Sequence, residues 1–80
     1  SISKGWKKMW SDVRLKENVT FKGKVVDINT YTWNYKWDAS TTHSGVMAQE
    51  LLGTKYADAV EIQDNGFYMV DYDKLPKELH

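Results

Sequence analysis

The sequence contains no cysteine, a single proline and two histidines. The absence of cysteine excludes disulfides and thiolate metal sites, and it suits a reducing compartment. His43 and His80 are too few and too far apart to form a metal centre, so we expect no metal and no cofactor. A chain of 80 residues buries only a modest share of its surface, and small folds without disulfides or metals usually need another stabiliser. Self-association is therefore the expected source of additional stability.

Long apolar runs are also absent. No segment approaches the roughly 20 apolar residues of a membrane span, and Ser1–Trp10 lacks the apolar core of a secretory signal. This segment carries two tryptophans and three lysines, but ten residues are short for an interfacial anchor. We expect no membrane partner, and we interpret residues 1–10 as the end of an upstream passenger or linker.

The net charge is zero but unevenly distributed. Residues 1–24 carry seven basic and two acidic side chains, a net charge of +5, and the rest carries four basic and nine acidic ones, a net charge of −5. A basic segment can contact nucleic acid. Attraction between the two ends, within one subunit or between subunits, explains the pattern better, so no nucleic-acid partner is predicted.

Aromatic residues alternate with polar ones between Asn29 and Asp38. A period of two with aromatic and β-branched residues predicts a strand with one aromatic face. In a chain short of core material this face is expected to form the core. The alternative is an exposed row that stacks on sugars or bases. The aromatic residues concerned are Tyr31, Trp33, Tyr35 and Trp37.

The remaining segments predict short elements. Asn65-Gly66 between two apolar runs indicates a hairpin, and Gly53 suits the left-handed residue that ends a helical turn. Polar composition predicts irregular structure at 17–23 and 38–42. Further expectations are a helical turn or short strand at 24–28, a strand at 43–48, a helical turn at 49–52, strands at 60–63 and 67–70, and a helix near 71–76 capped by Asp71 or Asp73. The sequence thus predicts a small single α+β domain of about four short strands and one or two short helices, with strand order left open.

The stretch from Ser11 to Lys16 carries potential chemistry. Serine beside lysine is one way to build a nucleophile–base pair without cysteine. The lysine must be neutral, so its pKa has to be lowered from about 10.4, either by burial or by the like charge of Arg14 if the two side chains approach. Positions i and i+5 share neither a helix face nor a strand face, so the pair needs a bend between them or a lysine from another subunit. The alternative is a structural role for Ser11-Asp12 as a helix N-cap or turn.

Three segments together resemble a known family. The segments are 11–19, 43–51 (histidine, any residue, glycine, two apolar residues, alanine, glutamine, glutamate, apolar) and 70–75. In this order they resemble the intramolecular chaperone auto-processing domains found at the carboxyl end of bacteriophage tail spikes, tail fibres and neck appendages. A related domain occurs in a membrane-bound animal transcription factor.

The resemblance implies a self-cleaving folding device. Such a domain forms a homotrimer, holds its passenger chains in register while they fold, and then cuts itself off before the motif serine. Here the cut is implied between Trp10 and Ser11, with residues 11–80 as the auto-processing domain. Ser11 is implied as the nucleophile and Lys16 as the base. The supporting residues implied by the motifs are Asp12, His43, Gln49 and Glu50.

Two expectations follow on where and how this device works. It is expected in the host bacterial cytoplasm during assembly, or on the virion tail if it is not cleaved. The family commonly continues into a long helix that builds a triple coil, whereas this sequence has Pro76 soon after the last motif. The trimer is therefore expected to rest on the globular part. The alternatives are a permanent, non-cleaving trimeric tip for assembly or host attachment, and a sugar- or nucleic-acid-binding module using the aromatic row.

Overall fold

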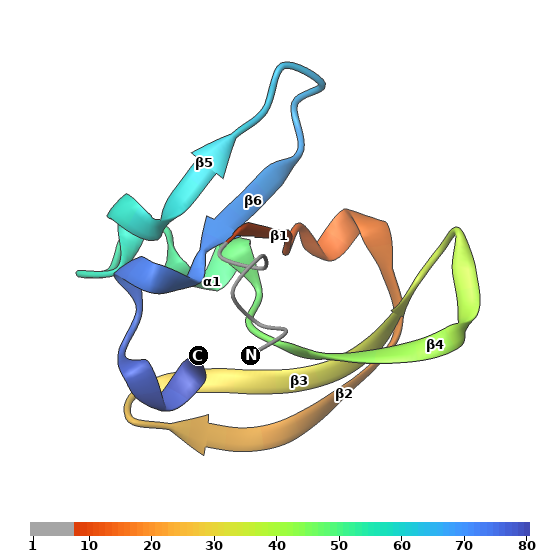
Figure 1. The fold of residues 1–80 in the computed structure, drawn as a ribbon, viewed down its shortest axis with the longest axis horizontal. Helices are drawn as coiled ribbons and strands as arrows, with labels where there is room; N and C mark the ends of the chain where they lie inside the picture. Colours follow the sequence, from red (N-terminus) through yellow and green to blue (C-terminus); the bar gives the residue numbers. More distant parts are fainter. Residues whose placement is uncertain (1–7) are drawn as a thin grey trace.

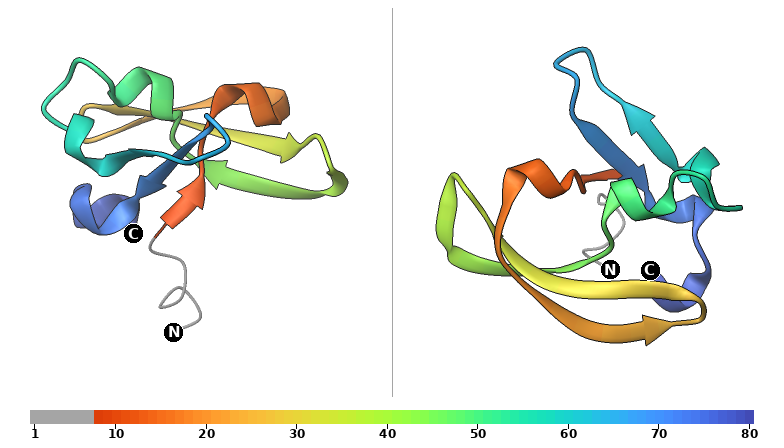
Figure 2. Two further views of the ribbon diagram at one scale, coloured as in Figure 1. Left: turned by 90° about the horizontal axis from the view of Figure 1, so that it is seen from above. Right: turned by 180° about the vertical axis from the view of Figure 1, so that it is seen from behind.

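Two three-stranded antiparallel sheets make up the fold in the computed structural model, which describes residues 8–80 (Figures 1 and 2). The first sheet is a meander in the order β2-β3-β4, and the second has the order β1-β6-β5. The strands are β1 (Lys8–Trp10), β2 (Lys16–Val25), β3 (Ile28–Tyr35), β4 (Asp38–Gly45), β5 (Val60–Ile62) and β6 (Tyr68–Asp71). The other elements within residues 8–80 are one α-helix, α1 (Ala48–Leu51), and 3₁₀ turns η2 (Val13–Leu15), η3 (Ala57–Ala59), η4 (Tyr72–Lys74) and η5 (Lys77–Leu79).

The expected α+β class is therefore wrong, because the described chain is mostly β. Residues 17–23 and 38–42, expected to be irregular, belong to β2 and β4. These two strands lie at the edges of their sheet, and many of their side chains face solvent, so they need no apolar residues to be stable. The helix expected near residues 71–76 is reduced to 3₁₀ turns, although Asp71 does cap η4 by accepting a hydrogen bond from the Asp73 N–H.

Several other predicted elements are confirmed. Exceptions are residues 24–28, which span the end of β2, a turn and the start of β3, and the strand expected at 43–48, which ends at residue 45. The aromatic segment forms β3, the turn at 49–52 is α1, and Gly53 has a φ of +79°. The hairpin around Asn65-Gly66 joins β5 and β6, which pair from Val60 opposite Val70 to Ile62 opposite Tyr68. Figure 1 shows this hairpin projecting away from the meander, with α1 between them.

Strand β1 lies in the segment expected to belong to the passenger or linker. Residues 1–7 of that segment lie outside the described residues, but Lys8–Trp10 pair along β6, with Lys8 opposite Asp71 and Trp10 opposite Met69. The expected cleavage point therefore falls directly after an edge strand of the second sheet.

Two small cores stabilise the fold. The larger one packs α1 and the second sheet around fully buried Val46, Ala48, Ala59 and Val70. The smaller one contains Trp33, Tyr35 and Met47, with Trp10, Leu15 and Tyr31 packed against them. Trp33 and Tyr35 are only 1% and 6% exposed, so the expected aromatic core is confirmed for these two rings. Trp37 lies beyond the end of β3 and is exposed, so the row is not one continuous outer surface.

Gly45 allows the two cores to meet. Its φ is +155°, and a Cβ at this position would lie 2.2 Å from the Tyr72 hydroxyl and 3.0 Å from the Trp33 ring. Only glycine therefore fits where β4 passes between these side chains. The tight passage leads directly into Val46 and Met47, which line the candidate site.

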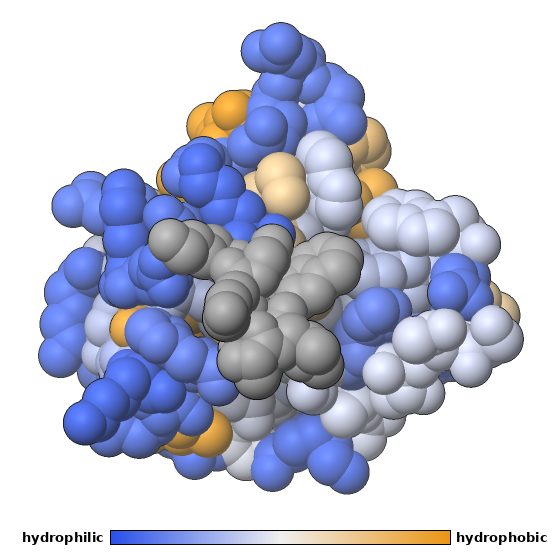
Figure 3. Space-filling view, in the orientation of Figure 1, coloured by the Kyte–Doolittle hydropathy of each residue, from blue (hydrophilic) through white to orange (hydrophobic). Residues whose placement is uncertain are grey.

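The described surface is mixed. Side chains of intermediate hydropathy gather at the right of the face shown in Figure 3, over the β3–β4 hairpin, where β4 is rich in serine and threonine. Between residues 8 and 80, no helix has the length and apolar character needed to cross a membrane. Several large apolar side chains are exposed, including Phe21, Trp37 and Ile62.

Candidate functional site

A single 3₁₀ turn provides the bend that the Ser11–Lys16 spacing requires. η2 takes up residues 13–15 and separates Ser11 and Asp12, which follow β1, from Lys16, the first residue of β2. Asp12 caps the turn by accepting a hydrogen bond from the Arg14 N–H. The turn itself is largely exposed, whereas Ser11 and Asp12 are 0% exposed and Lys16 is 5% exposed. The chain therefore buries all three polar groups on the inner side of one short bend.

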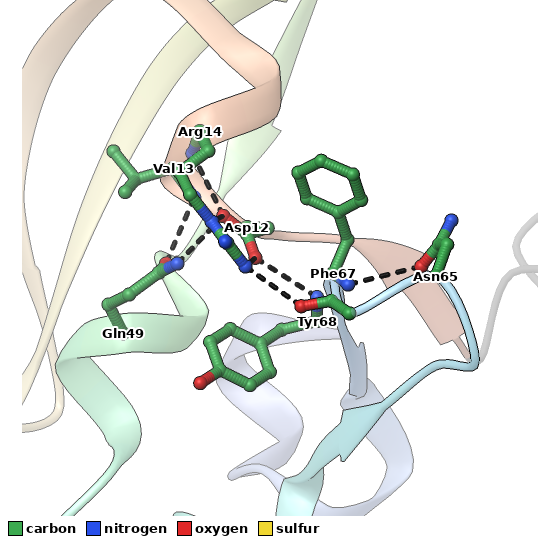
Figure 4. Close-up of polar contacts among 8 residues, drawn as sticks. Asp12, Val13, Arg14, Gln49, Asn65, Phe67 and Tyr68 are labelled. Carbon is green, nitrogen blue, oxygen red and sulfur yellow. Dashed lines mark hydrogen bonds and ion pairs between the residues drawn. The ribbon is translucent and has the colours of Figure 1, made fainter.

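Asp12 is the hub of a buried polar network (Figure 4). Its carboxylate accepts hydrogen bonds from the Arg14 Nε at 2.9 Å and Nη2 at 2.7 Å, and from the Tyr68 N–H at 3.1 Å. The amide of Gln49 donates a further bond at 2.7 Å. Burial alone would raise the pKa of Asp12, but these donors outweigh it and hold that pKa well below its usual range. Asp12 is therefore an ionised structural anchor.

Arg14 and Gln49 tie this anchor to the rest of the fold. Arg14 donates to the Gly66 carbonyl at 2.9 Å, and its guanidinium lies 4.8 Å from the Phe67 ring centroid. Gln49 donates to Asp12 and accepts from the Val13 N–H at 2.9 Å. These contacts join η2 to the β5–β6 hairpin on one side and to α1 on the other (Figure 4). The expected supporting residues Asp12 and Gln49 are thus brought together beside Ser11.

Lys16 is a buried amine without a carboxylate partner among residues 8–80. Its Nζ donates to the Val46 carbonyl at 2.8 Å, contacts the Met47 sulfur at 3.4 Å, and lies 3.5 Å from the Trp33 ring centroid. Burial lowers the pKa of Lys16 to about 7, although the charges of Asp12 and Glu50 act in the opposite direction. A substantial fraction of this amine is therefore neutral near pH 7, as a general base requires.

The peptide bond between Trp10 and Ser11 is held at both ends. The Ser11 N–H donates to the Tyr68 carbonyl at 3.2 Å. The carbonyl oxygen of Trp10 accepts a hydrogen bond from the hydroxyl of Tyr35. The next carbonyl, that of Ser11, accepts from the Ala48 N–H at 2.8 Å. Residues from β6, β3 and α1 thus fix the orientation of this bond.

Ser11 and Lys16 approach the same backbone segment from two sides. The Ser11 hydroxyl donates to the Met9 carbonyl at 3.3 Å, and the Ser11 carbonyl accepts from Ala48 in the segment that follows Val46. Burial raises the pKa of the nearby Tyr72 hydroxyl above its usual value. The Tyr72 hydroxyl accepts from the Val46 N–H at 3.0 Å, while the Val46 carbonyl accepts from Lys16. Within residues 8–80, no hydrogen bond joins the Ser11 and Lys16 side chains directly, and both residues instead contact the segment 46–48.

The other two expected supporting residues lie further away. His43 sits opposite Trp33 in the β3–β4 register, and its ring centroid is 4.7 Å from that of Tyr35. Glu50 accepts from the Tyr31 hydroxyl at 2.6 Å and from the Asn29 amide at 3.4 Å, so it fastens α1 to β3. His43 thus packs against the aromatic core, and Glu50 is held by its partners on β3.

Sequence reasoning missed three contributors to the site. Arg14 was considered only for its charge, Tyr35 only as a core ring, and Tyr72 only as part of a terminal motif. A signal was available for the tyrosines, because a buried tyrosine hydroxyl usually finds a hydrogen-bond partner. Their partners lie 25 and 26 residues away in the chain, and no local pattern predicts such pairings.

A comparison with known protein families gives a match that covers most of the chain. A family model described as Peptidase S74, chaperone of endosialidase, matches residues 11–61. The match begins at Ser11 and includes Lys16, His43 and the Gln49-Glu50 pair. Searches of curated proteins and of solved structures find no match.

Proposed function

Because the chain belongs to the chaperone of endosialidase family, whose name carries both a chaperone role and a serine peptidase-type auto-processing domain, we propose that it is a self-cleaving trimeric chaperone of a phage tail protein. Residues 11–80 are the auto-processing domain, and residues 1–10 are the end of the passenger or its linker. The passenger is a tail fibre or tail spike segment. The device acts in the host bacterial cytoplasm during assembly.

The observation that carries the proposal is the buried amine of Lys16. Its pKa is lowered to about 7, and it lies next to the segment that also contacts the buried Ser11. A buried lysine without a carboxylate partner costs folding free energy when it is charged. A stable turn does not require a buried lysine, so a purely structural role does not explain this free-energy cost. A serine nucleophile, in contrast, needs a neutral base.

The proposed reaction proceeds in two steps. The Lys16 amine leaves the Val46 carbonyl and accepts the Ser11 hydroxyl proton, while Ser11 Oγ attacks the carbonyl carbon of Trp10. The bond between that carbon and the Ser11 nitrogen breaks, the departing amine takes a proton from the Lys16 ammonium, and an ester remains. Water then hydrolyses the ester, which releases the Trp10 carboxylate and restores the Ser11 hydroxyl.

Trimerisation followed by cleavage has a physical rationale. Long β-rich fibre chains lose much conformational entropy before their non-local contacts form. A trimeric clamp at one end raises their effective concentration and sets their register. Once the clamp is removed, the passenger cannot unfold by the reverse of the path along which it folded. Its unfolding is therefore slow, and the product is kinetically stabilised.

Mass spectrometry of the full chain tests the proposal. The wild-type chain is purified in denaturant and refolded, and it should yield a fragment that begins at Ser11. Ser11→Ala and Lys16→Met should remain whole, whereas Lys36→Met, at an exposed position, should cleave like the wild type. The cleavage rate should rise with pH around a midpoint near 7, because the base must be neutral. An uncut wild-type chain after prolonged incubation as a folded trimer would contradict self-cleavage.

A non-cleaving trimeric tip is the second candidate. It is favoured by the hydrogen bond from Lys16 to the Val46 carbonyl, which occupies the amine. On this proposal the same refolding experiment gives an uncut trimer at every pH, and Ser11→Ala changes neither chain length nor fibre yield.

A further inference from the structure

The hydroxyl of Tyr35 donates a hydrogen bond to the carbonyl oxygen of Trp10, the carbonyl of the bond that the proposed function breaks. Tyr35 is the last residue of β3 and is only 6% exposed. When Ser11 Oγ attacks, the carbonyl carbon becomes tetrahedral and its oxygen gains negative charge. A donor already fixed on that oxygen stabilises this charge without further reorganisation.

We propose that Tyr35 is a catalytic residue of the self-cleavage reaction, the donor that stabilises the oxyanion on Trp10. This inference rests on the proposed function. In the step concerned, the pair of electrons from Ser11 Oγ forms the new C–O bond, and the carbonyl π electrons move onto the Trp10 oxygen. Tyr35 keeps its proton and only donates it more strongly. The electrons return as the C–N bond breaks.

The surrounding rings hold the phenol in place. Trp37 stacks on Tyr35 at a centroid distance of 4.6 Å with an interplanar angle of 6°, and Trp33 meets it edge-on at 5.9 Å. His43 lies against the same ring at 4.7 Å. This packing gives the motif histidine a positioning role that needs no contact with Ser11. The burial that results raises the pKa of Tyr35 to about 12, so the hydroxyl retains its proton.

The Trp33 ring also packs against the phenol. It meets the Tyr35 ring edge-on, and its buried indole N–H makes no hydrogen bond in the described part of the chain. Trp33 therefore contributes to the packing that holds Tyr35 in place.

Cleavage kinetics test the role of Tyr35. Tyr35→Phe removes the hydroxyl and keeps the ring, and it should slow cleavage of the refolded chain by about 10²- to 10³-fold, the usual effect of losing one oxyanion donor. The pH midpoint should stay that of the wild type, because Lys16 sets it. Tyr56→Phe is the matched control, since the Tyr56 hydroxyl bonds Asp27, and it should cleave at the wild-type rate. If Tyr35→Phe also cleaves at that rate while Ser11→Ala stays whole, the inference fails and the proposed function stands.

A second measurement does not depend on cleavage. Trp10-Ser11 is the single Trp-Ser pair in the sequence, so labelling tryptophan with ¹³C at its carbonyl and serine with ¹⁵N gives one amide–carbonyl correlation for this bond. In the Lys16→Met background, Tyr35→Phe should shift the Trp10 carbonyl resonance upfield because its hydrogen bond is lost, whereas Tyr56→Phe should not. An unchanged resonance overturns the inference, whether or not the wild-type chain cleaves.

Discussion

At the scale of single residues, the site combines one group kept charged and another whose charge is disfavoured. Asp12 and Lys16 are both buried and lie four positions apart. Asp12 is surrounded by N–H donors that favour its carboxylate form, whereas burial dominates the surroundings of Lys16 and lowers its pKa to about 7. Environments that favour the charged form of one titratable group and the neutral form of its neighbour are typical of functional sites. Here the charged group has the structural role and the neutral one the chemical role.

Replacing Asp12 tests its role as an anchor. Asp12→Asn should lower the free energy of unfolding by roughly 2 kcal/mol at pH 7, because charge-assisted hydrogen bonds are lost from a half-exposed Arg14 and a buried carboxyl. The folded pKa is depressed, so the stabilisation is present above about pH 4 and is lost as the pH falls further. Urea unfolding between pH 2 and 7 measures this. Equal acid sensitivity in the Asn variant would argue against the prediction.

Lys16 should also make stability rise with pH, but in a higher pH window and because its charged form is disfavoured in the folded state. Its folded pKa is about 7, below the unfolded value of about 10.4. The cost of burying the charge is therefore fully present below pH 7, shrinks between about pH 7 and 10, and disappears above that range. Unfolding of the uncleaved Ser11→Ala chain should show stability rising across this window. The rise should vanish when Lys16→Met is added and persist with Lys36→Met.

At the scale of elements, those encoded by local sequence patterns were predictable, whereas those that depend on long-range pairing were not. Alternation in β3, the Asn65-Gly66 turn and the left-handed Gly53 each depend on neighbours in sequence, and all three were predicted. β2 and β4 were missed in part because edge strands tolerate the polar residues that also make loops. β1 was missed because three residues carry no periodicity and gain their structure from pairing with β6.

The turn between β2 and β3 contains a strained residue. Val26 has a φ of +59° and is exposed, and this conformation costs a β-branched residue about 1–2 kcal/mol. Val26→Gly should therefore stabilise the domain by up to about 1 kcal/mol, after the entropy that glycine gains in the unfolded chain. Thermal unfolding of the uncleaved Ser11→Ala chain measures the change. Val19→Gly, at an exposed position inside β2, should destabilise it, and a loss at both positions would show that the turn is not strained.

At the scale of the whole molecule, the two cores are small and the surface is not fully polar. Phe21, Trp37 and Ile62 are 56%, 61% and 69% exposed. Such side chains are covered when copies of a chain associate, and association is what the absence of cysteine led us to expect. On the proposed function, this association is the trimer that holds the passenger chains in register.

The proposed trimer predicts a stability that depends on concentration. The uncleaved Ser11→Ala chain should have three times the monomer mass by light scattering, and its unfolding temperature should rise with protein concentration because association is coupled to folding. A monomeric mass with an unfolding temperature independent of concentration would exclude the chaperone mechanism as well as the tip.

The pairing of β1 with β6 has a consequence for the state that follows cleavage. The proposed cut leaves Lys8–Trp10 covalently on the passenger, although in the intact chain these residues pair with Asp71, Val70 and Met69 of the piece to be released. Cleavage of this one peptide bond thus leaves β1 as the end of a separate chain that is held to the domain by its pairing with β6. Dissociation then requires that strand to peel away, and a short peptide with the same three residues should compete for the vacated edge. The lifetime of the nicked complex is set by this strand rather than by the chemistry that created it.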